Sequence, residues 1–123
     1  MNTVRIILPL PPRVVSPNGR AHWAAKARAV KAMRYRAAAE VLAARGKDRA
    51  VWPAATVQVT YYHRDRRRRD GDNALASCKA FIDGIADAGL VADDVALTYP
   101  PVRFKVDKAR PRVELEISPP KSS

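Results

Sequence analysis

Residues 56–87 read TVQVTYYHRDRRRRDGDNALASCKAFIDGIAD, and this stretch decides the fold class. In residues 56–63, the side chains of Val57, Val59 and Tyr61 alternate with those of Gln58, Thr60 and Tyr62, which is the period of a β-strand. In residues 72–87, apolar side chains recur three or four positions apart, which is the period of a helix. A strand followed by an amphipathic helix indicates an α/β layer. The helical apolar face consists of Leu75, Cys78, Ile82 and Ile85.

The residues before this stretch predict a strand and a long helix. Residues 3–8 (TVRIIL) form a short β-branched run that prolines end, as expected of a first strand. Residues 13–21 are expected to be a loop. Residues 22–45 predict an alanine-rich helix that opens with a contact from His22 and has one packed face, while the rest of its surface is cationic. The packed positions are Trp23, as a core anchor, with Ala27, Val30, Ala37 and Val41.

The residues after the second helix predict strands. Residues 95–99, 102–106 and 112–117 alternate apolar and polar side chains, and the last two segments are expected to form a closing hairpin. The predicted order is therefore β-α-β-α-β-β. This is an α/β (α+β) single domain over residues 1–118, with a mixed sheet of about four strands and two main helices. Residues 119–123 are expected to be a disordered tail.

The composition restricts the function. The 123 residues include 23 Lys+Arg and 12 Asp+Glu, a formal net charge of +11 that predicts a polyanionic partner. A single cysteine and two histidines exclude an internal disulfide and a Cys/His zinc framework, so a metal would need carboxylate ligands. No segment approaches the roughly 20 apolar residues of a membrane span, and no signal peptide is recognisable. We expect a cytoplasmic protein with no membrane partner.

The charges are unevenly distributed. Residues 20–49 hold nine basic residues against two acids, and residues 64–69 hold five against one. Residues 70–94 hold six aspartates against a single lysine, Lys79. A protein that only coated a phosphate backbone would gain nothing from these aspartates, because each repels phosphate unless a cation intervenes.

The spacing of the aspartates suggests a shared site. At 100° per residue, Asp72, Lys79 and Asp83 fall within about 40° of one another around the second helix. Asp70 precedes that helix and an Asp-Asp pair follows it at residues 93–94. If the flanking strands are parallel neighbours, the strand-associated aspartates come close together. Several carboxylates around one point bind Mg²⁺ or Mn²⁺, which activates water and neutralises a phosphodiester under attack.

The same residues also have simpler interpretations. An aspartate before a helix is commonly an N-cap, and Lys79 with Asp83 is an ordinary i,i+4 pair. An arginine run is commonly a solvated or phosphate-facing surface, and Cys78 on the apolar face is expected only to pack. Spacing alone leaves open both a metal-dependent enzyme and a nucleic-acid-binding module.

The segments RDRRRRDGDN (residues 64–73) and FIDGIADAGLVADD (residues 81–94) resemble the signature of the RusA family of Holliday-junction resolvases. That signature is an Arg-rich run, Asp-x-Asp-Asn, a helix with an Asp, Ala-Gly and an Asp-Asp pair. The N-terminal ILPLPP and SPNGRAHW are also similar to family members. The resemblance implies a small homodimer that cuts four-way DNA junctions symmetrically, using Mg²⁺ or Mn²⁺, in a bacterial or phage-infected cell.

The resemblance also implies roles for individual residues. Family members have an important lysine one turn after Asp-x-Asp, where this chain has Ala76, so the resemblance carries that role to Lys79. The catalytic metal ligands correspond to Asp70, Asp72 and Asp94. The supporting acids are Asp83 and Asp93.

DNA binding is expected on the two basic segments. The residues are Lys26, Arg28, Lys31 and Arg34 in the first helix and Arg64, Arg66, Arg67, Arg68 and Arg69 in the arginine run. Two rival functions stay open. One is a non-catalytic DNA-binding protein that keeps this fold, and the other is a basic RNA-binding protein.

Overall fold

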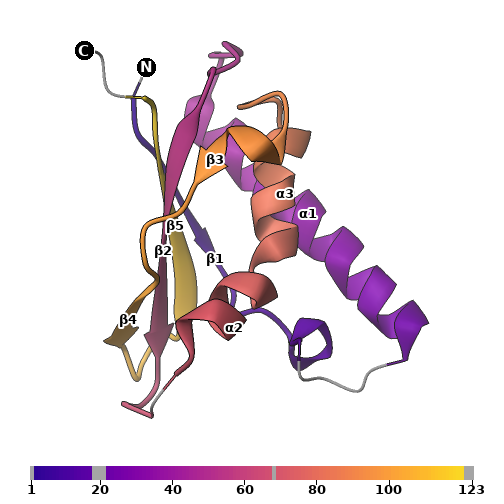
Figure 1. The fold of residues 1–123 in the computed structure, drawn as a ribbon, viewed down its shortest axis with the longest axis vertical. Coiled ribbons are helices and arrows are strands. Elements are labelled where there is room, and N and C mark those ends of the chain that lie inside the picture. The colour runs from indigo at the N-terminus through magenta and orange to yellow at the C-terminus, as the bar shows by residue number, and fades with distance from the viewer. Residues whose placement is uncertain (1, 18–21, 68, 121–123) are drawn as a thin grey trace.

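The computed structural model describes residues 2–17, 22–67 and 69–120, and within them helices cover one face of a mixed sheet (Figure 1). The strands are β1 (Val4–Leu8), β2 (Ala55–His63), β3 (Leu97–Thr98), β4 (Arg103–Val106) and β5 (Arg112–Ser118). The helices are α1 (Trp23–Arg45), α2 (Gly71–Ser77) and α3 (Lys79–Asp87), with short 3-10 helices η1 (Arg13–Val15) and η2 (Asp94–Ala96).

The mixed sheet is confirmed, and it has five strands in the described part of the chain rather than about four. β5 lies between β1 and β2 and is antiparallel to both. The other edge of β2 pairs in parallel with β3 at its start and with β4 at its end. The parallel pairing agrees with the strand–helix–strand order, because a crossover through helices returns the chain in the same direction.

The predicted closing hairpin is wrong, because β4 and β5 pair with opposite edges of β2. The connection between them passes the end of β2, where the Asp107 backbone N–H donates to the His63 carbonyl at 2.8 Å. In a hairpin, the backbone groups of β4 would pair with those of β5, and the outer edge of β2 would stay unpaired at residues 60–63. Pairing β4 there satisfies those backbone groups instead.

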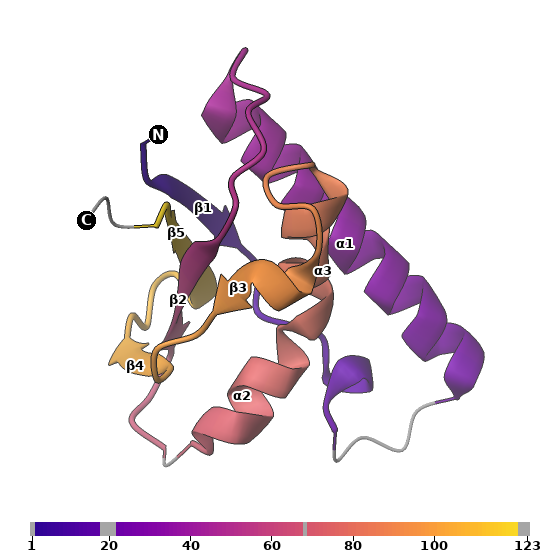
Figure 2. The ribbon, with the colours of Figure 1, turned by 45° about the horizontal axis from the view of Figure 1, so that its top comes forward.

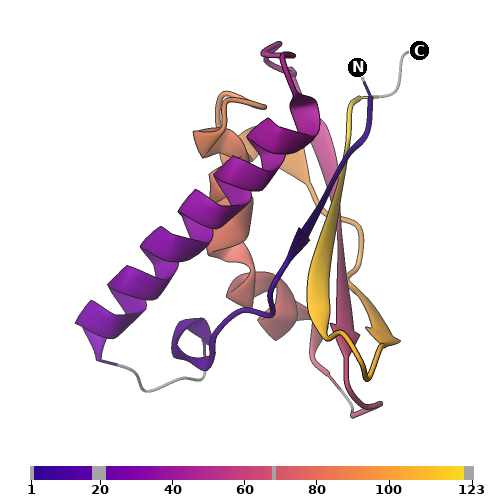
Figure 3. The same ribbon diagram turned by 180° about the vertical axis from the view of Figure 1, so that it is seen from behind.

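The core lies between the sheet and the helices. Every second residue of β1 and β5 is buried, and the intervening residues point to the opposite face of the sheet, which carries no helix (Figure 3). On that open face Arg5 binds Glu116 across the strands at 2.6 Å. The alternation therefore gives the sheet one apolar face, which the helices cover, and one charged face.

Helix α1 is confirmed, with His22 as its N-cap accepting from the Ala24 backbone N–H at 3.2 Å. Its packed face is shorter than predicted: Ala37 and Val41 are buried together with Met33, but Ala27 is exposed. The prediction of Trp23 as a core anchor is wrong, because its side chain is 77% exposed. The reason is geometric, since α1 diverges from the sheet toward its N-terminal end (Figures 1 and 3).

The predicted second helix is two helices, α2 and α3, which meet at Cys78 (Figure 2). The Tyr61 hydroxyl donates to the Ala74 carbonyl at 2.6 Å and lies 3.1 Å from Cys78 Sγ, so a side chain enters the helix at the bend. α3 packs closely on α1, because a Cβ on Gly84 would lie 2.6 Å from the Arg34 carbonyl oxygen. Gly89, at φ +81°, ends the helical region as predicted.

The remaining segments differ modestly from their predictions. The expected loop at residues 13–21 contains η1, and residues 18–21 lie outside the described part. The strand expected at residues 95–99 is limited to Leu97–Thr98. Of the expected disordered tail, residues 119–120 carry no regular structure and 121–123 lie outside the described residues. None of the helices described here combines the length and apolar composition that a membrane crossing requires.

Candidate functional site

A groove of about 620 Å³ runs between α2, α3 and the segment that leads into β3. Asp72 lines it from α2, Lys79 from α3 and Asp94 from η2, while apolar side chains such as Ile82 and Leu97 form its floor. We call it the acidic groove. It brings together three of the residues that the resemblance assigns to the site, although the helix between Asp72 and Lys79 is bent.

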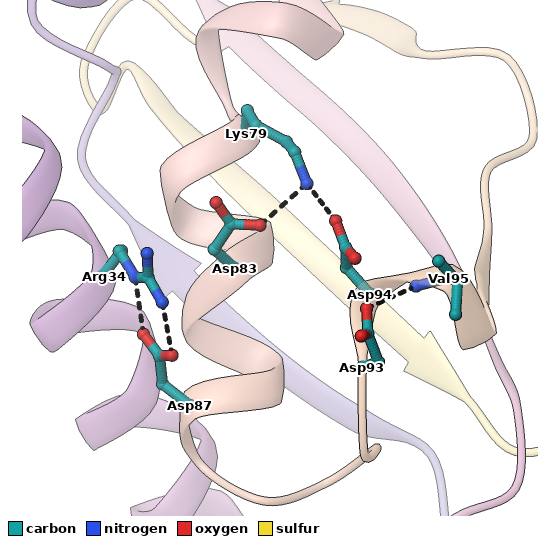
Figure 4. Close-up of polar contacts among 7 residues, drawn as sticks. All are labelled: Arg34, Lys79, Asp83, Asp87, Asp93, Asp94 and Val95. Atoms are coloured by element: carbon teal, nitrogen blue, oxygen red, sulfur yellow. Dashed lines mark hydrogen bonds and ion pairs between the residues drawn. The ribbon is translucent and has the colours of Figure 1, made fainter.

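Lys79 is the centre of the charged cluster in the acidic groove (Figure 4). Its Nζ donates to Asp83 Oδ1 at 2.8 Å and also to Asp94 Oδ2. These hydrogen bonds, first that to Asp83, raise the pKa of Lys79, so it keeps its proton at neutral pH. The bond from Lys79 is also the largest cause that lowers the pKa of Asp94. Two carboxylates from different elements thus converge on one cationic point.

Asp70 lies outside the acidic groove. It is the N-cap of α2, and its Oδ1 accepts from the Asp72 backbone N–H at 2.9 Å and from that of Asn73 at 3.4 Å. Its side chain lines a second pocket instead. The structure therefore brings Asp72 and Asp94 to one groove and places Asp70 at its border, where it satisfies backbone donors of α2.

Asp93 also acts as a cap. Its Oδ1 accepts from the Val95 backbone N–H at 3.2 Å at the start of η2, which orients the neighbouring Asp94 toward Lys79 (Figure 4). The supporting role that the resemblance implies for Asp93 is compatible with this position. The cap fixes the turn from which Asp94 projects.

The carboxylates of the acidic groove suit a metal site that water and substrate complete, rather than a cage built of protein ligands alone. Among residues 2–17, 22–67 and 69–120, no three His, Cys, Asp or Glu side chains lie close enough together to form a metal cage. Mg²⁺, however, commonly takes only one or two carboxylates and completes its shell with water and substrate phosphates. Asp72 and Asp94 both line the groove, so they are the two carboxylates that this second arrangement would use, with a phosphate supplying ligands that the protein does not.

Arg34 is bound to the protein itself. Its Nε and Nη2 donate to the two carboxylate oxygens of Asp87 at 2.8 and 2.7 Å, joining α1 to α3 (Figure 4). This pair lowers the pKa of Asp87. The other basic residues predicted on α1 to bind DNA are exposed, and they are Lys26, Arg28 and Lys31.

The arginine run follows β2 and turns beside α2. Arg64, Arg66 and Arg67 are exposed, and Arg69 is partly buried with its Nη2 on Asp65 at 3.1 Å. Arg68 lies outside the described residues. Arg64, Arg67 and Arg69 line the second pocket, so these cations lie on the other side of α2 from the acidic groove.

Sequence reasoning did not identify a second pocket on the other face of α2. Tyr61 and His63 of β2 and Phe104 of β4 line it together with Asp70. The sequence around Phe104 does not indicate that this residue belongs to a pocket. Its position beside β2 depends on the pairing of β4 with β2, which the predicted hairpin excluded. The signal that could have found it is the aromatic pair at Tyr61 and His63, which share one face of a strand.

Comparisons with known proteins relate this chain to an individual protein rather than to a family model. No family model matches the chain. An uncharacterized protein of Xylella fastidiosa is 35% identical over 108 residues, which cover 85% of this chain and 69% of that protein.

Proposed function

This chain belongs to the same family as the Xylella fastidiosa protein, and from its own residues we propose that it is a metal-dependent endonuclease that resolves four-way DNA junctions. The observation that carries the proposal is the convergence of Asp83 and Asp94, from different elements, on Lys79 in a groove that Asp72 also lines. Carboxylates concentrated in one groove of a chain with a net charge of +11 favour phosphodiester chemistry over simple phosphate coating.

In the proposed site, the acidic residues would bind the metal and the lysine would bind the phosphate. Asp72 and Asp94 would hold Mg²⁺, which supplies neutralisation of phosphate charge and a more acidic bound water. Lys79 carries a proton that its two carboxylate partners stabilise, so it is a permanently charged donor for a phosphate oxygen. Asp83 orients the Lys79 ammonium from one turn along α3.

The basic segments would bind the arms of the junction. Arg28 and Lys31 on α1 and Arg64 and Arg66 in the arginine run are exposed, as phosphate contacts require. A four-way junction needs two cuts, and a two-fold homodimer would supply two such grooves related by symmetry. The resemblance to junction resolvases favours this substrate over plain duplex.

The test is incubation of the protein with an end-labelled, mobile four-way junction, with and without Mg²⁺, followed by a denaturing gel. We expect symmetric paired nicks that need the metal. Asp72→Asn should abolish cutting and leave junction binding intact or tighter, because it removes a negative charge that repels phosphate.

The matched control is Asp87→Asn, which removes an aspartate of α3 that lies outside the acidic groove and binds Arg34. This variant should cut as well as the wild type. If both variants lose cutting equally while remaining folded, the assignment of Asp72 as a metal ligand is wrong.

A second candidate function is a DNA-binding protein without catalysis. The favouring observations are that Lys79 already occupies the space between two carboxylates and that Asp70 is engaged as a helix cap. This candidate predicts junctions that are bound but uncut under every metal condition, with an affinity that does not depend on Mg²⁺.

A further inference from the structure

The second pocket, with a volume of about 850 Å³, lies at the carboxyl end of β2. Three aromatic rings form one wall of it. The His63 ring stacks on Tyr61, with centroids 5.3 Å apart and planes inclined by 18°, and on Phe104, with centroids 6.0 Å apart and planes inclined by 19°. We call this wall the aromatic shelf.

The aromatic shelf is rigid at one end and open at the other. Tyr61 is buried, and its hydroxyl is fixed by the Ala74 carbonyl of α2 at 2.6 Å. Phe104, on the edge strand β4, is 38% exposed. The aromatic shelf therefore presents the ring surface of Phe104 to solvent on the wall of the pocket, where a ligand could cover it.

His63 contributes as a neutral ring. Burial and the charge of Arg69 lower its pKa, against an opposing effect of Asp65, so the imidazole is uncharged at neutral pH. Its Nε2 is shielded from solvent and has no hydrogen-bond partner in the described part of the chain. The ring thus completes a triangle of aromatic rings with Tyr61 and Phe104, whose own centroids lie 5.8 Å apart.

Cations surround the aromatic shelf. Four arginines line the same pocket, which are Arg13 from η1 and Arg64, Arg67 and Arg69 from the arginine run. Two carboxylates, those of Asp65 and Asp70, also line it. Asp65 is engaged with Arg67 and Arg69. Within residues 2–17, 22–67 and 69–120, Arg13 and Arg64 form no ion pair, so two guanidinium groups remain for an external anion.

We propose that this pocket binds one unstacked nucleobase of single-stranded or branched DNA, with the base on the aromatic shelf and its phosphate on Arg13 and Arg64. Aromatic rings edged by arginines are the general solution for holding unpaired bases, because every base has a π-face and every nucleotide a phosphate. The inference rests on the proposed function only for its choice of DNA, since a branch point is where duplex bases become unstacked.

The experiment compares two probes by fluorescence anisotropy in EDTA. One probe is a labelled oligothymidylate of about eight nucleotides, and the other is an abasic deoxyribose-phosphate chain of equal length. Both carry the same phosphates, so only the bases differ. Wild-type protein should bind the thymidylate about tenfold more tightly than the abasic chain.

Three variants test the assignment to the shelf. Phe104→Ala should reduce the preference for bases to less than about twofold, and Phe104→Trp should keep it, because the indole ring also stacks. Val106→Ala, a truncation two residues further along β4 at a side chain outside the pocket, should also keep the preference. Thermal melting confirms that each variant is folded.

Equal binding of the two probes by the wild type would overturn the proposal, as would an equal loss for both probes in Phe104→Ala. Tighter binding of oligouridylate than of oligothymidylate would overturn the choice of DNA. The assay contains no metal and involves no cleavage. A protein that cuts no junction can therefore still show base binding, and a true nuclease can fail this test.

Discussion

At the scale of single residues, Lys79 is placed where a bound cation would be expected. Its ammonium donates to Asp83 of its own helix and to Asp94 of η2, which are 11 positions apart in the chain. An ammonium and a hydrated Mg²⁺ satisfy carboxylates in the same electrostatic way, so Mg²⁺ bound as proposed would compete with Lys79 for Asp94. The competition makes Lys79 the residue whose replacement is most informative.

Lys79→Ala should therefore strengthen metal binding while it prevents cutting. Removing a unit charge about 4 Å from a divalent cation changes the energy of that cation by about 2 kcal/mol even in water, which corresponds to about thirtyfold tighter binding of Mn²⁺. Electron paramagnetic resonance of free Mn²⁺ measures this affinity. Unchanged Mn²⁺ affinity in Lys79→Ala would show that Asp94 does not bind the metal.

Arg34 and Asp87 form a pair whose role is predicted to be structural. The pair is partly exposed, so Arg34→Ala should lower the free energy of unfolding by no more than about 1 kcal/mol. Because the pKa of Asp87 is lowered in the folded protein, this contribution is present above about pH 4 and is lost as the pH falls through the lowered value. Urea titrations of both proteins between about pH 3 and pH 7 measure the difference.

Lys31→Ala is the control for Arg34, because Lys31 is exposed on the same helix. It should leave the unfolding free energy within about 0.5 kcal/mol of the wild type at every pH. A difference between wild type and Arg34→Ala that persisted undiminished at acid pH would contradict the assigned pair.

At the scale of elements, the contact between α1 and α3 depends on a glycine. A Cβ on Gly84 would lie 2.8 Å from the Ala37 Cβ and 2.6 Å from the Arg34 carbonyl oxygen, where the backbone cannot yield easily. Gly84→Ala should therefore cost about 1–3 kcal/mol of unfolding free energy, measured by urea denaturation. Gly71→Ala is the control, because nothing lies within 4 Å of the added Cβ, and it should be neutral or slightly stabilising.

The elements also show what could be predicted from the sequence and what could not. Strands β1 and β2 and helix α1 were predictable because their period and their proline or glycine ends are local signals. The pairing of β4 with β2 was not predictable, because a short connection after an alternating segment is typical of a hairpin. The competing edge of β2 lies 43 residues away in the chain at Thr60↔Arg103. The bend at Cys78 depends on Tyr61 in the same way, through a contact between elements.

The candidate site likewise has features that follow from local sequence and features that depend on contacts between elements. The placement of Asp72, Lys79 and Asp83 on one side of the helical region followed from helical geometry, which the bend only modified. Whether Asp70 faces the metal or caps α2 was a choice between two short-range interactions, and the structure has the cap. The aromatic shelf required strand order, which no periodicity encodes.

At the scale of the whole molecule, the helices cover one face of the sheet and leave the other open (Figure 3). Basic side chains that could contact a nucleic acid therefore lie on two different surfaces, the helical side and the open face of the sheet. Arg103 and Lys105 lie on the open face beside Glu114 and Glu116, whose carboxylates bind Arg112 and Arg5. Arg28 and Lys31 lie on α1, where acids are sparse. A nucleic acid should therefore bind along α1, and it should avoid the open face of the sheet, where acids and bases alternate.

Two double variants that remove the same charge distinguish these surfaces. Arg28→Gln with Lys31→Gln should reduce the slope of log K against log salt for duplex DNA by about 1.8, because two phosphate contacts are lost. Arg103→Gln with Lys105→Gln lowers the net charge equally and should leave that slope unchanged. Filter binding between about 50 and 200 mM salt measures both slopes. Equal changes in the two variants would mean that net charge alone attracts the DNA, whereas a change confined to the second variant would place the DNA on the open sheet.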